Sequence, residues 1–138
     1  MIVTARKKFK KYIYSSINES NEFVFTLNSQ TSEFALIFGI YSLNLIKEKD
    51  FLNQNSLEWS KKILLNLSVY KEKRKKINKN LIFDKPYLQL LTFSLSALKI
   101  LNFNDKELIN NIIEDVLPTN IELLLKKTDA LNGKAGSG

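Results

Sequence analysis

Residues 34–46 read FALIFGIYSLNLI, and residues 87–98 read YLQLLTFSLSAL. Both stretches are apolar at almost every position, but each falls short of the roughly 20 apolar residues that a membrane-spanning helix needs. A helix that is apolar on nearly every face must be covered on most of its sides. We therefore predict no membrane span, but two buried helices, Ser32–Lys47 and Pro86–Leu101, with the rest of the chain packed around them.

Four further helices are predicted beside these two. Thr4–Ile17 precedes them and leads into a polar connection with a short extended piece at Phe23–Leu27. Ser56–Ile77 and Asp105–Leu117 carry apolar residues on one side only, so each is expected to cover a buried helix. The last helix is predicted at Asn120–Leu131. Glycine and proline are scarce, at 4 and 2 residues, and the predicted class is all-α, built from antiparallel αα-hairpins.

Three of the predicted helix starts carry a capping signal. Asn55–Glu58, Asn104–Glu107 and Thr119–Glu122 each place an Asn or Thr three residues before a Glu. Such a pair can satisfy free amides of the first helical turn from both directions. Pro86 suits a first turn, where its missing N–H costs nothing, and Pro118 separates the fifth helix from the sixth.

The chain also contains an internal similarity. Tyr41–Leu43 matches Phe93–Leu95 at an offset of 52 residues, and the helices that follow match at an offset of 49, with Asn55 opposite Asn104. Matched caps and matched apolar faces predict an αα-repeat, and a plain helical bundle is the alternative.

Each predicted hairpin pairs a buried helix with an amphipathic one over about 50 residues. With the segments Phe34–Lys47 and Tyr87–Lys99, this arrangement resembles the hairpins of α/α-toroid proteins over Ser32–Leu117. Toroid families include terpene cyclases, prenyltransferase β-subunits and many polysaccharide lyases and glycosidases. The resemblance implies part of an α/α toroid or solenoid, but the sequence has none of their catalytic motifs, so no catalytic residue is assigned.

The net charge is +7, from 21 Lys and Arg against 14 Asp and Glu, and two clusters, Arg6–Lys11 and Lys71–Lys76, supply most of it. Such clusters can mark a nucleic-acid or acidic-lipid surface. Only two of the 21 basic residues are Arg, the residue favoured for phosphate and base contacts. Lys, Asn and Ile make up 48 of the 138 residues, which is typical of AT-rich coding sequence. We predict no sequence-specific nucleic-acid binding.

The sequence contains no cysteine and no histidine. Disulfides, thiolate or imidazole metal sites and histidine-dependent nucleophilic dyads are therefore excluded within these residues. We expect no cofactor and no metal. The basic cluster Arg6–Lys11 is not followed by the apolar run of a secretory signal, so the expected location is cytoplasmic.

Two long connections, Ser20–Thr31 and Asn78–Lys85, precede the two buried helices and are expected to lie at the same end of the array. Long loops on a helical scaffold often carry binding groups. With the adjoining helix starts they offer groups that suit a sugar or a peptide: Asn21, Asn28, Gln30, Glu33, Asn80, Asp84, Lys85 and Tyr87. The structural alternatives are a helix N-cap for Asp84, a favourable helix-terminus position for Glu33 and a core position for Tyr87.

The predicted function is a non-catalytic helical-repeat domain, residues 1–131, that binds a partner or acts as a scaffold. The alternative is the N-terminal portion of an α/α-toroid enzyme acting on a carbohydrate or isoprenoid. Residues 132–138 are rich in Gly and Ser and read as a flexible tail or a loop toward further chain. Apolar surface is expected along the fourth and sixth helices, covered by a protein partner, more of the same chain or a second copy.

Overall fold

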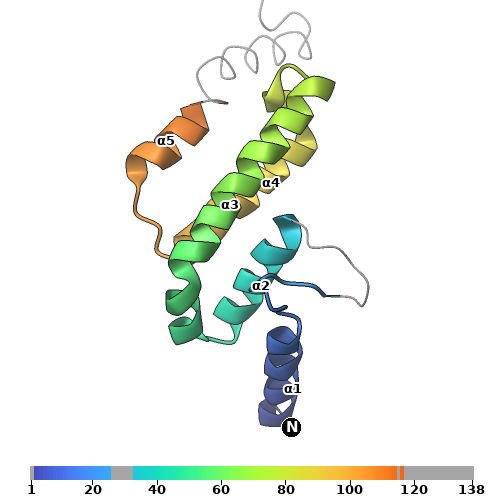
Figure 1. Ribbon diagram of the computed structural model, residues 1–138, viewed down its shortest axis with the longest axis vertical. Helices are drawn as coiled ribbons and strands as arrows, with labels where there is room; N and C mark the ends of the chain where they lie inside the picture. Colours follow the sequence, from blue (N-terminus) through green and yellow to red (C-terminus); the bar gives the residue numbers. More distant parts are fainter. Residues whose placement is uncertain (1, 26–32, 115, 117–138) are drawn as a thin grey trace, which may run out of the picture.

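The structure, a computed structural model, describes residues 2–25, 33–114 and 116 (Figure 1). In order, the elements are α1 (Ile2–Ser15), α2 (Glu33–Leu45), α3 (Lys49–Ile77), the 3-10 turn η1 (Leu81–Phe83), α4 (Lys85–Ile100) and α5 (Lys106–Glu114). The described residues form no strand, and an isolated antiparallel bridge joins Ile17 to Phe23. The predicted all-α class is confirmed. The predicted sixth helix and the tail, residues 120–138, lie outside the described residues.

Helices α2, α3 and α4 contact one another pairwise and form the body of the molecule. Helices α3 and α4 run side by side in opposite directions, whereas α1 projects from one end (Figure 1). Six of the 16 residues of α4 and five of the 13 residues of α2 are buried, against five of 29 in α3. The prediction that the second and fourth helices are the most buried is confirmed for the described helices.

Helix α2 ends in a left-handed turn at Lys47, whose φ is 62°. The N–H of Glu48 donates to the carbonyl of Leu43 at 2.9 Å, a bond that satisfies the last turn of the helix. Helix α4 ends in the same motif at Asn102, whose φ is 59°. The two helix ends therefore correspond at an offset of 55 residues, from 47 to 102, and the predicted offset of 52 does not align them.

The turn at Lys47 also moves the start of the third helix. Helix α3 begins at Lys49, seven residues before the predicted start at Ser56. Asn55, predicted as an N-cap, lies inside the helix, where its side-chain N–H donates to the carbonyl of Phe51 at 2.9 Å. The prediction was wrong because the turn at Lys47 reverses the chain at once, so the first turn of α3 forms upstream of the Asn55–Glu58 pair.

Helix α4 is amphipathic rather than apolar on every face. Its exposed residues recur every three or four positions and are all polar: Lys85, Gln89, Thr92, Ser96 and Lys99. The opposite face, including Leu90, Ala97 and Leu98, is buried. The expected apolar surface along the fourth helix is therefore wrong for this exposed row, because its polar side chains already provide a face that water can solvate.

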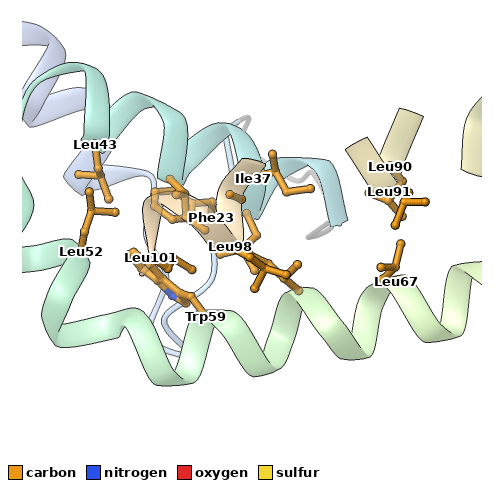
Figure 2. Close-up of a cluster of buried hydrophobic side chains, with 14 of the residues drawn as sticks. Phe23, Ile37, Leu43, Leu52, Trp59, Leu67, Leu90, Leu91, Leu98 and Leu101 are labelled. Atoms are coloured by element: carbon orange, nitrogen blue, oxygen red, sulfur yellow. The ribbon is translucent and has the colours of Figure 1, made fainter. Parts of the chain in front are cut away.

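The core is centred on Trp59 of α3, which is fully buried (Figure 2). The ring of Phe23, from the connection after α1, lies 5.4 Å from the Trp59 ring, and Phe51 meets it edge-on at 5.7 Å. The indole N–H donates to the backbone carbonyl of Asn21 at 3.1 Å. The loop after α1 is thus part of the core, and Gly39 of α2 lies against the Phe23 ring.

Polar contacts hold α1 against the turn between α2 and α3. The guanidinium of Arg6 donates to the carbonyl of Ile46 at 2.6 Å, and Lys10 forms an ion pair with Glu48 at 2.6 Å. Ile13 of α1 is buried in the core. The hydrogen bond from Lys10 is the main cause that lowers the pKa of the Glu48 carboxyl below its usual value. Two members of the first basic cluster therefore have a structural role.

Candidate functional site

Asp84 occupies a buried position at the start of α4. Its carboxylate accepts a hydrogen bond from the N–H of Tyr87 at 3.1 Å, so the N-cap interpretation is confirmed. It also accepts two hydrogen bonds from the Arg74 guanidinium, from Nε at 2.9 Å and from Nη2 at 2.7 Å. These bonds tie the end of α3 to the start of α4. The hydrogen bonds from Arg74 are the largest influence on the pKa of Asp84, which is lowered although burial acts in the opposite direction.

We expect Asp84 to make stability depend on pH. Because its pKa is lowered by folding, the ionised carboxylate stabilises the folded state above the unfolded value of about 3.9. This contribution is lost as pH falls through the folded-state pKa. The free energy of unfolding of the wild type should therefore fall more steeply below about pH 4 than that of Asp84→Asn. Urea unfolding followed by Trp59 fluorescence measures both profiles, and parallel profiles would contradict this assignment.

The other predicted binding residues do not converge on one site. Tyr87 is buried, which confirms its core interpretation, and the side chain of Asn80 accepts from the N–H of Ile82 at the start of η1. Lys85 is exposed at the start of α4. Glu33 lies in the first turn of α2, on the other side of α3 from the pocket that Tyr87 lines. Asn28 and Gln30 lie outside the described residues.

Asn21 holds the connection after α1 against α3. Its side-chain N–H groups donate to Asn55 at 2.7 Å and to Glu58 at 2.8 Å, and its φ of 61° is left-handed. Lys62 donates to the neighbouring Ser20 carbonyl at 3.0 Å. Asn suits this position because it adopts the left-handed conformation more readily than most residues.

Glu33 borders two adjoining surface hollows of about 240 and 230 Å³, which share Leu65 and Asn66. A third, of about 220 Å³, lies between α3, α4 and α5 and has a mainly apolar lining that includes Tyr87 and Leu108. The described residues contain no group of three or more Asp or Glu side chains arranged to hold a metal ion.

The most distinctive surface lies along α2 and α4. We call it the aromatic strip, and it consists of Phe34, Phe38, Tyr41 and Leu45 of α2 with Phe93 of α4. The rings of Phe34, Phe38 and Tyr41 lie 6.3, 6.4 and 6.3 Å from that of Phe93. The Tyr41 hydroxyl donates to the Phe93 carbonyl at 3.1 Å.

Phe38, Tyr41 and Leu45 of the aromatic strip have no charged neighbour on α2. Phe38 is 47% exposed and Leu45 is 76% exposed. No charged residue occurs in α2 after Glu33, and the exposed residues of α4 nearest to Phe93 in sequence are Gln89, Thr92 and Ser96. The spacing of the α2 residues, 34, 38, 41 and 45, could have revealed one row on a helix, but the whole segment is apolar and no contrast marked that row.

Comparisons with protein-family models, with curated proteins and with solved structures give no match to this chain. None of the described helices combines the length and the apolar character needed to cross a membrane.

Proposed function

We propose that this chain is a non-catalytic helical scaffold domain that associates with a second copy of itself through the aromatic strip. The observation that carries the proposal is the uncharged row of large apolar side chains on α2, in which Phe38 and Leu45 are exposed. Solvent contact of Phe38 and Leu45 is unfavourable, and complete burial of one such side chain contributes about 1.5–3 kcal/mol.

A second copy is the occupant that fits the charge distribution. In a two-fold symmetric contact the same surface patch of both copies meets, so a patch of one charge would repel its counterpart. The chain carries a net charge of +7, but the aromatic strip itself carries no charge. Residues at positions i, i+4, i+7 and i+11 form a ridge that can pack against the grooves of another helix. The strip therefore suits α2 of a second copy.

The remaining predictions are not tested by these observations. The αα-repeat, the α/α-toroid resemblance and its enzymatic alternative, and the cytoplasmic location stay predictions. An open reading frame that continues with further hairpins of about 50 residues and acidic clusters would favour the toroid enzyme.

The test is the solution mass of the full chain. We expect a dimer of twice 16.0 kDa in light scattering, and a monomer for Phe38→Glu and Leu45→Glu with an unchanged helical circular-dichroism spectrum. A charge introduced into a symmetric interface is present twice and is left without a partner.

A matched control is available on α3. Leu57 is 70% exposed, close to the 76% of Leu45, but lies outside the aromatic strip. Leu57→Glu should leave the dimer intact. A wild type that remains at 16.0 kDa at high concentration, or strip variants that dimerise like the wild type, would rule out this proposal.

A further inference from the structure

A second surface, separate from the aromatic strip, lies where α3 passes through η1 into α4. We call it the basic tip, and it consists of these exposed residues: Lys73, Lys75, Lys76, Ile77, Lys79, Phe83 and Lys85. This connection lies at one end of the long axis of the molecule, and α1 lies at the other end (Figure 1). The two basic clusters of the sequence are therefore not parts of one surface.

Among the described residues, the positive charge of the basic tip is largely uncompensated. Of the two carboxylates within the described segment 71–85, Asp84 is held by Arg74, and Glu72 lies 3.9 Å from Lys75 in an exposed ion pair. An exposed pair at this distance contributes little. The other four lysines of the tip form no ion pair among the described residues. They are free to contact an anionic surface.

Apolar side chains project among these lysines. Ile77, the last residue of α3, is 72% exposed, and Phe83 of η1 is partly exposed. Lysines around exposed apolar side chains are typical of proteins that bind the surface of an anionic bilayer. The ammonium groups contact lipid headgroups, while the apolar side chains enter the boundary between headgroups and acyl chains.

We infer that the basic tip docks the protein on anionic lipid membranes, with Lys73, Lys75, Lys76, Lys79 and Lys85 on the headgroups and Ile77 inserted between them. A nucleic acid fits less well. The one arginine of the region, Arg74, is engaged by Asp84, and an exposed aliphatic side chain has no partner on a phosphate backbone.

The cluster on α1 provides the matched control. Arg6 and Lys10 hold α1 on the body, which leaves three exposed lysines, Lys7, Lys8 and Lys11. A triple glutamine variant at these positions removes the same charge as a triple variant at Lys75, Lys76 and Lys79. A bilayer that contacts the basic tip cannot contact the opposite end of the same molecule, so only the second variant should lose membrane binding.

The experiment measures sedimentation of the full-length chain with phosphatidylcholine vesicles that contain or lack phosphatidylserine. We expect binding only to the phosphatidylserine vesicles. The tip triple variant should bind on the order of 100-fold more weakly, since each lysine near the surface contributes to the attraction. The α1 triple variant should stay within about 3-fold of the wild type. Ile77→Ser should weaken binding about tenfold at unchanged charge.

Three outcomes would overturn the proposal. Equal weakening by both triple variants would show attraction by net charge alone. An unchanged affinity of Ile77→Ser would exclude insertion of this side chain. Tighter binding to a short DNA duplex than to the vesicles would assign the basic tip to nucleic acid. Circular dichroism and Trp59 fluorescence verify that each variant is folded.

Discussion

Replacing Trp59 with alanine should lower the free energy of unfolding by about 3–5 kcal/mol. The side chain is fully buried and packs against Phe23 and Phe51. Its removal leaves a cavity bordered by these two rings and leaves the Asn21 carbonyl without its indole donor. A domain of this size is stable by only about 5–15 kcal/mol, so the loss is a large fraction of the total.

Urea unfolding followed by far-ultraviolet circular dichroism measures this change, because Trp59 is the only tryptophan and the variant lacks its fluorescence. Leu57→Ala is the control, since Leu57 lies two residues away on α3 but is largely exposed. Its free energy of unfolding should change by no more than about 0.5 kcal/mol. Similar losses in both variants would show that Trp59 does not occupy the centre of the core.

The all-α class and the burial of α2 and α4 could be predicted, because long apolar segments with few glycines and prolines favour helices that must be covered by the rest of the chain. The start of α3 could not be predicted. A left-handed residue that ends a helix is usually Gly, whereas this chain uses Lys47, which carries no such signal. Asn55 and Glu58 match the capping pattern, but both lie inside α3, which begins at Lys49.

The two faces of α4 were missed because its exposed row contains Gln, Thr and Ser among the lysines. These residues are uncharged and stand among many apolar ones, so the segment reads as apolar throughout. The opposite difficulty applies to α2, where the exposed residues Phe38 and Leu45 are as apolar as the buried ones. Periodicity reveals a surface only where composition changes from one face to the other.

Some roles of the candidate site residues could be predicted from the sequence, and others could not. The cap role of Asp84 follows from its local position before Pro86, and local chemistry could predict it. Its pairing with Arg74 depends on how α3 and α4 meet, which no local pattern contains. The role of Phe23 is similar, because a residue in a polar connection enters the core only through the position of Trp59 and Gly39.

The contact between Gly39 and Phe23 leads to a prediction whose sign opposes helix propensity. In an exposed helix, replacing Gly with Ala stabilises by about 1 kcal/mol. In α2, a Cβ atom at position 39 would lie 2.5 Å from carbons of the buried Phe23 ring. That separation is far below van der Waals contact, and overpacking of a close-packed core costs about 1–3 kcal/mol. Gly39→Ala should therefore lower the free energy of unfolding.

A double-mutant cycle separates the two contributions. Phe23→Leu removes the ring that the added Cβ would meet, so in that background Gly39→Ala should become neutral or stabilising by up to about 1 kcal/mol. Urea unfolding of the wild type, both single variants and the double variant gives the coupling between the two positions. If Gly39→Ala stabilises the wild type, then Phe23 does not lie against α2, and the connection after α1 would have to leave the core.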